Sequence, residues 1–139
     1  MVKDIYDARI RLAAAAPAPA HISQANLSLI RDNALCGDHI ALTARVEDGV
    51  FLQVSCVADG CLLCKAAAAL INVHAPGTFI TDAPVILAKL TTMFEDGVPP
   101  SEEPWRTLDM FLPLAAHRNR RKCVLLPFQV LAAGSAGSI

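Results

Sequence analysis

The strongest chemical signal in this sequence is a cysteine and an aspartate separated by one glycine, Cys36-Gly37-Asp38. Residues two apart in an extended backbone point to the same side, so this thiol and this carboxylate converge. Cys61 follows a second glycine at the predicted start of an alanine-rich helix, where unpaired amides and the helix dipole favour a thiolate. Both cysteines are candidate metal ligands or nucleophiles, although burial in the core accounts for either of them equally well when it is taken alone.

A third cysteine, Cys123, follows three basic residues in the last predicted helix, Arg120-Arg121-Lys122. Neighbouring cations favour the thiolate, which is the form that reacts or binds metal. Arg121 and Lys122 would also offset the negative charge of a site that contains several thiolates. The whole basic run, 117–122, is otherwise an exposed helix face, and because aromatic residues are almost absent nearby it makes a poor platform for nucleic acid.

A predicted β-hairpin can bring these residues together. The chain before residue 39 and the chain after residue 58 lie at the same end of such a hairpin, so Cys36, Asp38 and Cys61 can meet. With Cys123 they make three thiolates and one carboxylate. This set suits tetrahedral zinc, or an iron–sulfur cluster held with one labile oxygen ligand.

The two remaining cysteines, Cys56 and Cys64, are expected to play different roles. Cys56 falls on the apolar side of its predicted strand and is expected in the core. Cys64 lies three residues after Cys61, which is also the spacing of a thioredoxin-like redox pair. That pair requires a βαβ context, whereas this chain offers a hairpin before the motif and only helices after it. Cys64 could instead be a spare ligand or a sulfur relay.

The hydrophobic pattern predicts an α+β fold in which helices cover one face of a small antiparallel sheet of about three strands. The hairpin loop is predicted to hold three residues, Glu47-Asp48-Gly49, pairing Val46 with Val50 and Leu42 with Val54. The predicted strands are 26–30, 40–46 and 50–56, and the predicted helices are 3–14, 62–74, 84–94, 105–116 and 119–132. Residues 134–138 are expected to form a frayed tail.

Composition narrows the class of protein. The 139 residues fit a single domain, 1–139, and 54% hydrophobic against 5% aromatic residues indicates a core of small side chains. A formal charge of −1 argues against nucleic acid or membrane partners, and the absence of an apolar span or secretory signal points to the cytoplasm. Five cysteines in a reducing compartment indicate metal binding, catalysis or burial rather than disulfides.

Three motifs in this order resemble the U-type iron–sulfur scaffold family, which includes IscU, the N-terminal domain of NifU, and SufU. The motifs are Asn33-Ala34-Leu35-Cys36-Gly37-Asp38-His39-Ile40, Asp59-Gly60-Cys61 and Arg120-Arg121-Lys122-Cys123. The sequence is most similar to the SufU branch, because Lys122 precedes the last cysteine where IscU-like members carry histidine, and because the stretch from Cys61 to Cys123 is long. The resemblance spans nearly the whole chain.

The resemblance implies a NifU/IscU-like fold and a role in iron–sulfur cluster assembly. It implies that Asp38, Cys61 and Cys123 are retained metal ligands and that Cys36 accepts persulfide sulfur from a cysteine desulfurase of the SufS or IscS kind. The implied cofactor is Zn²⁺ in the SufU branch or a [2Fe–2S] cluster in the IscU branch, and the implied recipients are apo iron–sulfur proteins. The protein would then be a sulfurtransferase or a non-enzymatic scaffold.

Two other functions remain open from the sequence. One is a non-catalytic zinc domain, in which the metal only supplies folding energy. The other is a dithiol redox protein that uses Cys61 and Cys64.

Overall fold

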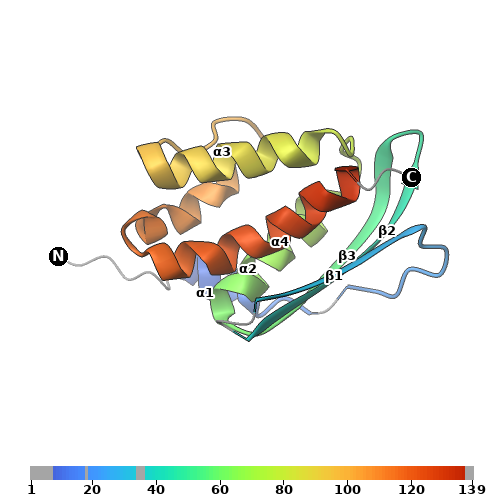
Figure 1. The fold of residues 1–139 in the computed structure, drawn as a ribbon, viewed down its shortest axis with the longest axis horizontal. Coiled ribbons are helices and arrows are strands. Elements are labelled where there is room, and N and C mark those ends of the chain that lie inside the picture. The colour runs from blue at the N-terminus through green and yellow to red at the C-terminus, as the bar shows by residue number, and fades with distance from the viewer. Residues whose placement is uncertain (1–7, 18, 34–36, 137–139) are drawn as a thin grey trace.

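The structure, a computed structural model, describes residues 8–17, 19–33 and 37–136. Its order of helices and strands confirms the predicted α+β class (Figure 1). The elements are α1 (Ala8–Ala14), β1 (Leu27–Asn33), β2 (Asp38–Glu47), β3 (Val50–Asp59), α2 (Leu62–His74), α3 (Asp82–Asp96), the 3₁₀ helix η1 (Trp105–Ala116) and α4 (Arg118–Ala136).

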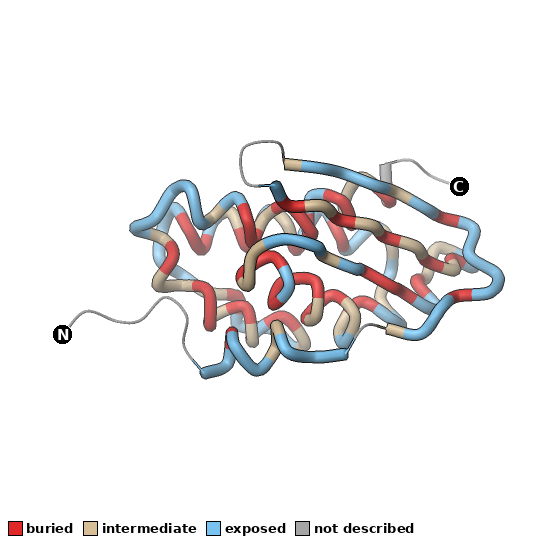
Figure 2. Tube along the Cα trace, turned by 90° about the horizontal axis from the view of Figure 1, so that it is seen from below, coloured by how far each residue is buried: buried red, intermediate tan, exposed pale blue. Residues whose placement is uncertain are grey.

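The three strands form one antiparallel sheet in the order β1-β2-β3. Along β2 buried residues alternate with half-buried ones, as Figure 2 shows, because successive side chains of a strand point to opposite faces. The inward positions are Asp38, Ile40, Leu42, Ala44 and Val46. The central strand therefore directs one carboxylate, at its first residue, to the same side as the apolar core.

The turn between β2 and β3 differs from the prediction. Only Asp48 and Gly49 form the loop, both with positive φ, and Glu47 pairs with Val50. The predicted pairs of Val46 with Val50 and Leu42 with Val54 are wrong, since Val46 lies opposite Phe51 and Leu42 opposite Cys56.

A β-bulge accommodates the shorter loop. The register shifts between Arg45 and Val46, so Leu52 is left without a partner and its side chain is 44% exposed. One extra residue in β3 exchanges the faces of every side chain after it. The bulge thereby returns Val54 and Cys56 to the buried face, where the two-residue turn alone would have placed Gln53 and Ser55.

Helices cover the inner face of the sheet, as predicted (Figure 1). Helix α2 packs against β3, and α4 packs against β1 and β2. On the side of α4 away from the sheet lie α3 and η1, while α1 packs against α2. Buried alanines on α2, Ala66 to Ala68, leave room for close contact with their neighbours. One hydrophobic cluster contains residues from every element.

The helix boundaries follow the predictions closely at α2, which covers 62–74 as expected. Helix α3 is longer than predicted at both ends, and residues 105–116 form a 3₁₀ rather than an α-helix. The first strand runs three residues beyond its predicted end. Residues 3–7 of the first predicted helix lie outside the described residues. No helix within the described ranges combines the length and apolarity that crossing a bilayer requires.

The predicted tail at 134–138 is wrong in its first residues, because α4 continues to Ala136. Gly134 lies inside the helix against β1, and a Cβ atom on it would come within 2.9 Å of Leu27 Cδ2. The packing of α4 on the sheet therefore keeps a glycine in helical conformation despite its low helix propensity.

The outer edge of β3 is closed by a side chain from α2. The Cys56 N–H donates to Asn72 Oδ1 at 2.6 Å, and Asn72 Nδ2 donates to the Cys56 carbonyl at 2.8 Å. These two bonds satisfy backbone groups that an edge strand otherwise leaves unpaired. Asn72 thus fixes α2 relative to the strand that leads to Cys61.

We expect Asn72→Ala to lower the free energy of unfolding by about 1–3 kcal/mol, because it leaves two part-buried backbone groups without partners. Urea denaturation measures the change. Gln53→Ala, at an exposed position on the same strand, is the control and should change stability by no more than about 0.5 kcal/mol. Equal stabilities of the two variants would contradict this role of Asn72.

Candidate metal centre

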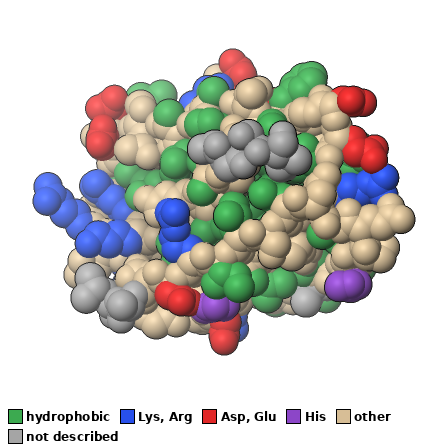
Figure 3. Space-filling model, turned by 45° about the vertical axis from the view of Figure 1, so that its right-hand side comes forward, with side chains coloured by type: hydrophobic (Ala, Val, Ile, Leu, Met, Phe, Trp, Pro, Cys, Tyr) green, Lys and Arg blue, Asp and Glu red, His purple; other side chains and the backbone are tan. Residues whose placement is uncertain are grey.

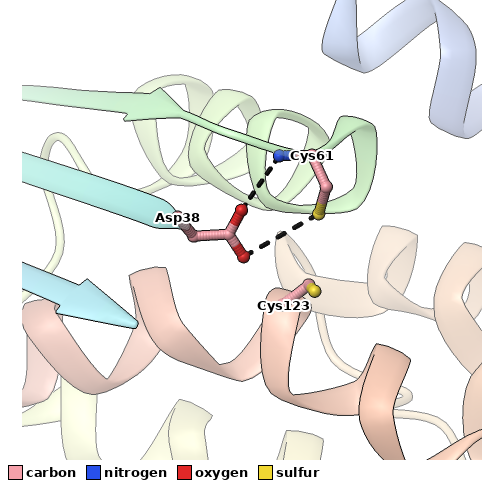
Figure 4. A group of neighbouring side chains, drawn as sticks. All are labelled: Asp38, Cys61 and Cys123. Atoms are coloured by element: carbon pink, nitrogen blue, oxygen red, sulfur yellow. Dashed lines mark hydrogen bonds between the residues drawn. The ribbon is translucent and has the colours of Figure 1, made fainter. Parts of the chain in front are cut away.

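Three potential metal ligands from distant parts of the sequence lie together at one end of the sheet (Figure 4). Asp38 is the first residue of β2, Cys61 precedes α2, and Cys123 lies in the second turn of α4. One oxygen and two sulfur donor atoms lie within 4.8 Å of one another. The structure therefore brings together three of the four residues that the sequence nominated.

Asp38 is almost fully buried, with 1% of its surface exposed. The Cys61 backbone N–H donates to Oδ1 at 2.9 Å, and Oδ2 lies 3.9 Å from Cys61 Sγ. A buried carboxylate is unfavourable unless hydrogen bonds or a cation compensate for lost water. The amide provides part of that compensation, and Oδ2 is left facing the two sulfurs.

Cys61 caps the N-terminus of α2, as the sequence predicted. Its backbone is extended, with φ −75° and ψ 162°, and its Sγ accepts the N–H of Cys64 at 3.4 Å. The residue is half-buried. This sulfur therefore lies at the positive end of the α2 helix dipole.

The surroundings of Cys123 contradict the expectation that neighbouring cations make it a thiolate. The side chain is buried, its Sγ contacts the Asn119 carbonyl at 3.9 Å, and burial raises the pKa of the thiol. Hydrogen bonding and negative charge from Cys61 and Asp38 raise this pKa further. A divalent ion between the three donors would favour the thiolate of Cys123 instead, because a coordinating thiol loses its proton.

Arg121, two residues before Cys123, contacts groups other than the three donors. The Arg121 guanidinium donates to the Ala115 carbonyl and lies over the Phe94 ring, with Cζ 5.9 Å from its centroid. Lys122 is exposed, and within the described part of the chain no hydrogen bond or ion pair links either residue to the three donors. Figure 3 shows Lys and Arg side chains gathered at the left of one face, with acidic side chains scattered around it. The role of Arg121 and Lys122 in offsetting the charge of a loaded site stays a prediction.

The other three cysteines are not among the three clustered donors. Cys36 lies outside the described residues, so its place in the site stays a prediction. Cys56 is buried in β3 and burial raises its pKa to about 12, which confirms its assignment to the core. Cys64 is fully buried, and the described sheet is antiparallel rather than part of a βαβ unit. A thioredoxin-like context for Cys61 and Cys64 is therefore not present in the described sheet.

From the sequence, Gly60 stands out only as the neighbour of Cys61. In the structure Gly60 has a φ of +149° and lies against Asp38. A signal was available, since each of the two central motifs pairs a glycine with a cysteine, but which atoms meet at Gly60 depends on strand pairing.

The donor set fits zinc or an iron of a cluster. Thiolate and carboxylate are ligands that both centres accept, and donors around a tetrahedral zinc lie about 3.5–3.8 Å apart. Atoms within 4.8 Å of one another need only a small rotation of side chains to reach such spacings. Three donors also leave a fourth coordination position for another ligand.

Fold and site together define a small α+β protein with a candidate Asp-Cys-Cys metal centre. No family model matches the sequence, and no curated protein matches it either. A NifU-like N-terminal protein from Brucella abortus shares the fold with a TM-score of 0.86 at 19% identity, over 94% of this chain and 91% of that one.

Two further solved structures have a similar fold. FiSufU from Fervidobacterium islandicum AW-1, assigned as an iron–sulfur cluster assembly scaffold of the SUF system, gives a TM-score of 0.84 at 20% identity, over 94% of this chain and 96% of that one. A hypothetical protein gives 0.82 at 17% identity, over 95% and 97%. The chain therefore has the fold of NifU-like N-terminal domains and of this SufU protein, as the sequence motifs had predicted.

The geometry of the three donors predicts one zinc ion per chain, and we expect Cys123→Ala to lose it because the variant removes a buried sulfur ligand. Native mass spectrometry after zinc loading and desalting measures the stoichiometry. Cys56→Ala, which truncates a buried cysteine outside the donor cluster, should retain the ion. Loss of zinc from both variants, or from neither, would contradict the assignment of Cys123.

Proposed function

We propose that this chain belongs to the U-type scaffold family and serves iron–sulfur cluster assembly, as a metal-binding scaffold or as a zinc-dependent sulfur acceptor. The observation that carries the proposal is the convergence of Asp38, Cys61 and Cys123 in a fold shared with a SUF scaffold protein. The order of the three cysteine motifs along the sequence supports the same family.

Asp38, Cys61 and Cys123 are the residues that would hold the metal, with Cys36 as the fourth ligand. Bound zinc would keep the thiols deprotonated and cross-link β2, α2 and α4. For a cluster carried as cargo, the same thiolates would bind iron, and the carboxylate would be the most weakly bound ligand. The hydrogen bond from the Cys61 amide to Asp38 orients the oxygen for either case.

Cys36 is the proposed sulfur acceptor, and a cysteine desulfurase is the proposed donor. When it is not bound to metal, the Cys36 thiolate attacks the outer sulfur of a persulfide on the donor. A new S–S bond forms at Cys36, the donor's S–S bond breaks, and the donor cysteine leaves as a thiolate, so no external oxidant or reductant is needed. Cys36 is separated from Asp38 by one residue, which ties the accepted sulfur to the metal centre.

The proposed setting is the cytoplasm, where thiols stay reduced, and the proposed recipients are apo iron–sulfur proteins. The described cysteines Cys56, Cys61, Cys64 and Cys123 form no disulfide with one another, which suits that setting.

Sulfur acceptance can be measured directly. After incubation with a cysteine desulfurase and cysteine, we expect intact-protein mass spectrometry to show the addition of one sulfur atom, lost on reduction with dithiothreitol. Cys36→Ser should abolish the addition, since serine forms no persulfide, whereas Cys56→Ala should leave it unchanged. Persulfide on Cys36→Ser equal to that on the parent would contradict the assignment of the acceptor.

The same experiment separates the alternatives. A structural zinc domain would bind zinc without gaining sulfur on any cysteine. A dithiol redox protein that uses Cys61 and Cys64 would lose its redox activity on Cys64→Ser, while its metal content would stay unchanged.

A second prediction concerns the Asp38 carboxylate as the labile ligand of a bound cluster. We expect Asp38→Ala to lengthen the lifetime of a reconstituted [2Fe–2S] cluster, because an oxygen ligand that assists its departure is removed. The decay of the visible absorption under air, compared with the parent, measures this lifetime. Decay as fast as in the parent would contradict the role of Asp38 in release.

A further inference from the structure

The carboxylate of Asp38 lies where a side chain at position 60 would otherwise be. A Cβ atom built on Gly60 would fall 2.1 Å from Asp38 Oδ1, 2.9 Å from its Cα and 3.0 Å from its Cγ. Packed atoms do not approach so closely. Only a residue without a Cβ atom leaves this space for the carboxylate.

Asp38 cannot withdraw from Gly60 by a backbone shift. Its main chain pairs with Asn33 of β1, and the next residue, His39, is held between Asp32 and Asp59. The Cα atom of Asp38 is itself one of the close atoms, so a change of rotamer would not relieve the contact. Gly60 also has a φ of +149°, which side-chain-bearing L-residues rarely adopt.

The space at Gly60 decides which oxygen of Asp38 is available. In it, Oδ1 accepts the Cys61 N–H at 2.9 Å. A hydrogen bond from an amide to a carboxylate is charge-assisted and directional. Oδ2 points instead towards the sulfur side, 3.9 Å from Cys61 Sγ. The two oxygens therefore have different tasks.

We propose that Gly60 is a positioning residue that makes Asp38 a single-oxygen metal ligand: the space it leaves commits Oδ1 to the Cys61 amide and presents only Oδ2 to the metal. This inference rests on the proposed metal site. It goes beyond naming Asp38 as a ligand, because it assigns the metal-facing oxygen and the residue that selects it.

A single-oxygen ligand has a chemical consequence. A carboxylate that used both oxygens would add a fifth donor, whereas one oxygen with three thiolates completes a four-coordinate set. Because Oδ1 stays bonded to the amide, the carboxylate keeps its orientation whether or not Oδ2 is coordinated. Asp38 can thus release and rebind a metal without rearranging β2 or α2.

The test compares two glycines. Gly60→Ala should lower the affinity for zinc by about 10- to 100-fold, the usual effect of disturbing a residue that orients a ligand. Gly49→Ala is the matched control, since Gly49 also has a positive φ, +74°, but no described atom lies within 4 Å of its Cβ position. It places a Cβ atom on a positive-φ glycine without the close contact to Asp38 and should bind zinc like the parent. Competition with a chromophoric chelator measures affinity, and circular dichroism checks that both variants are folded.

Zinc affinity of Gly60→Ala equal to that of Gly49→Ala would overturn the inference. If Gly60→Ala does not fold, hydrogen exchange at the Cys61 amide of the parent protein, with and without zinc, decides the question. Protection in both states supports a single-oxygen ligand. Loss of protection on adding zinc would overturn it, because both oxygens would then have turned towards the metal.

These readouts are independent of sulfur transfer. A parent protein that binds zinc with a protected Cys61 amide but accepts no sulfur would contradict the acceptor role while leaving the inference intact. A parent that binds no metal would overturn both the proposed function and the inference.

Discussion

The hydrogen bond between the buried carboxylate of Asp38 and the Cys61 amide is the contact on which the candidate centre depends. It joins the first residue of β2 to the residue that caps α2, and so links the sheet to the helical layer. A carboxylate in this buried position needs compensation for lost water, and the amide supplies only one bond. The centre therefore places a buried carboxylate and two cysteine sulfurs side by side.

The arrangement of the helices accounts for the position of Cys123 in this group. Helix α4 lies across the inner face of β1 and β2, and its second turn brings Cys123 to the end of the sheet where β2 begins. The same packing removes the thiol from water, so its proton is retained more strongly than in solution. Burial supplies the proximity that a metal site requires and also opposes the ionised form, which a metal cation would restore.

The likeness to the NifU-like and SufU structures holds at 19–20% identity. A fold can persist at such identity because its requirements are general: an alternating central strand, small residues on α2, and an edge strand closed by Asn72. The requirements of the centre are specific, since one oxygen, two sulfurs and a glycine without a Cβ atom must meet within a few ångströms. That contrast is why the fold alone does not assign a function and the donor set is needed.

The sequence by itself determined the elements with strong local patterns and the types of the donors. The alternation along β2, the alanine-rich α2 with its bounds at 62–74, and the Cys-Gly-Asp and Gly-Cys motifs are all short-range signals, because strand and helix periodicity are written in neighbouring residues. They were enough to predict the α+β class and to nominate Asp38, Cys61 and Cys123.

Only the tertiary structure decided the features that depend on contacts between distant residues. The bulge at Leu52, the helical conformation of Gly134 against Leu27, the raised pKa of Cys123 and the packing of Asp38 on Gly60 all belong to this group. Register, desolvation and close approach are set by atoms that meet after folding. A sequence pattern identifies the residues that could take part, but the energy of each contact depends on which surfaces the fold brings together.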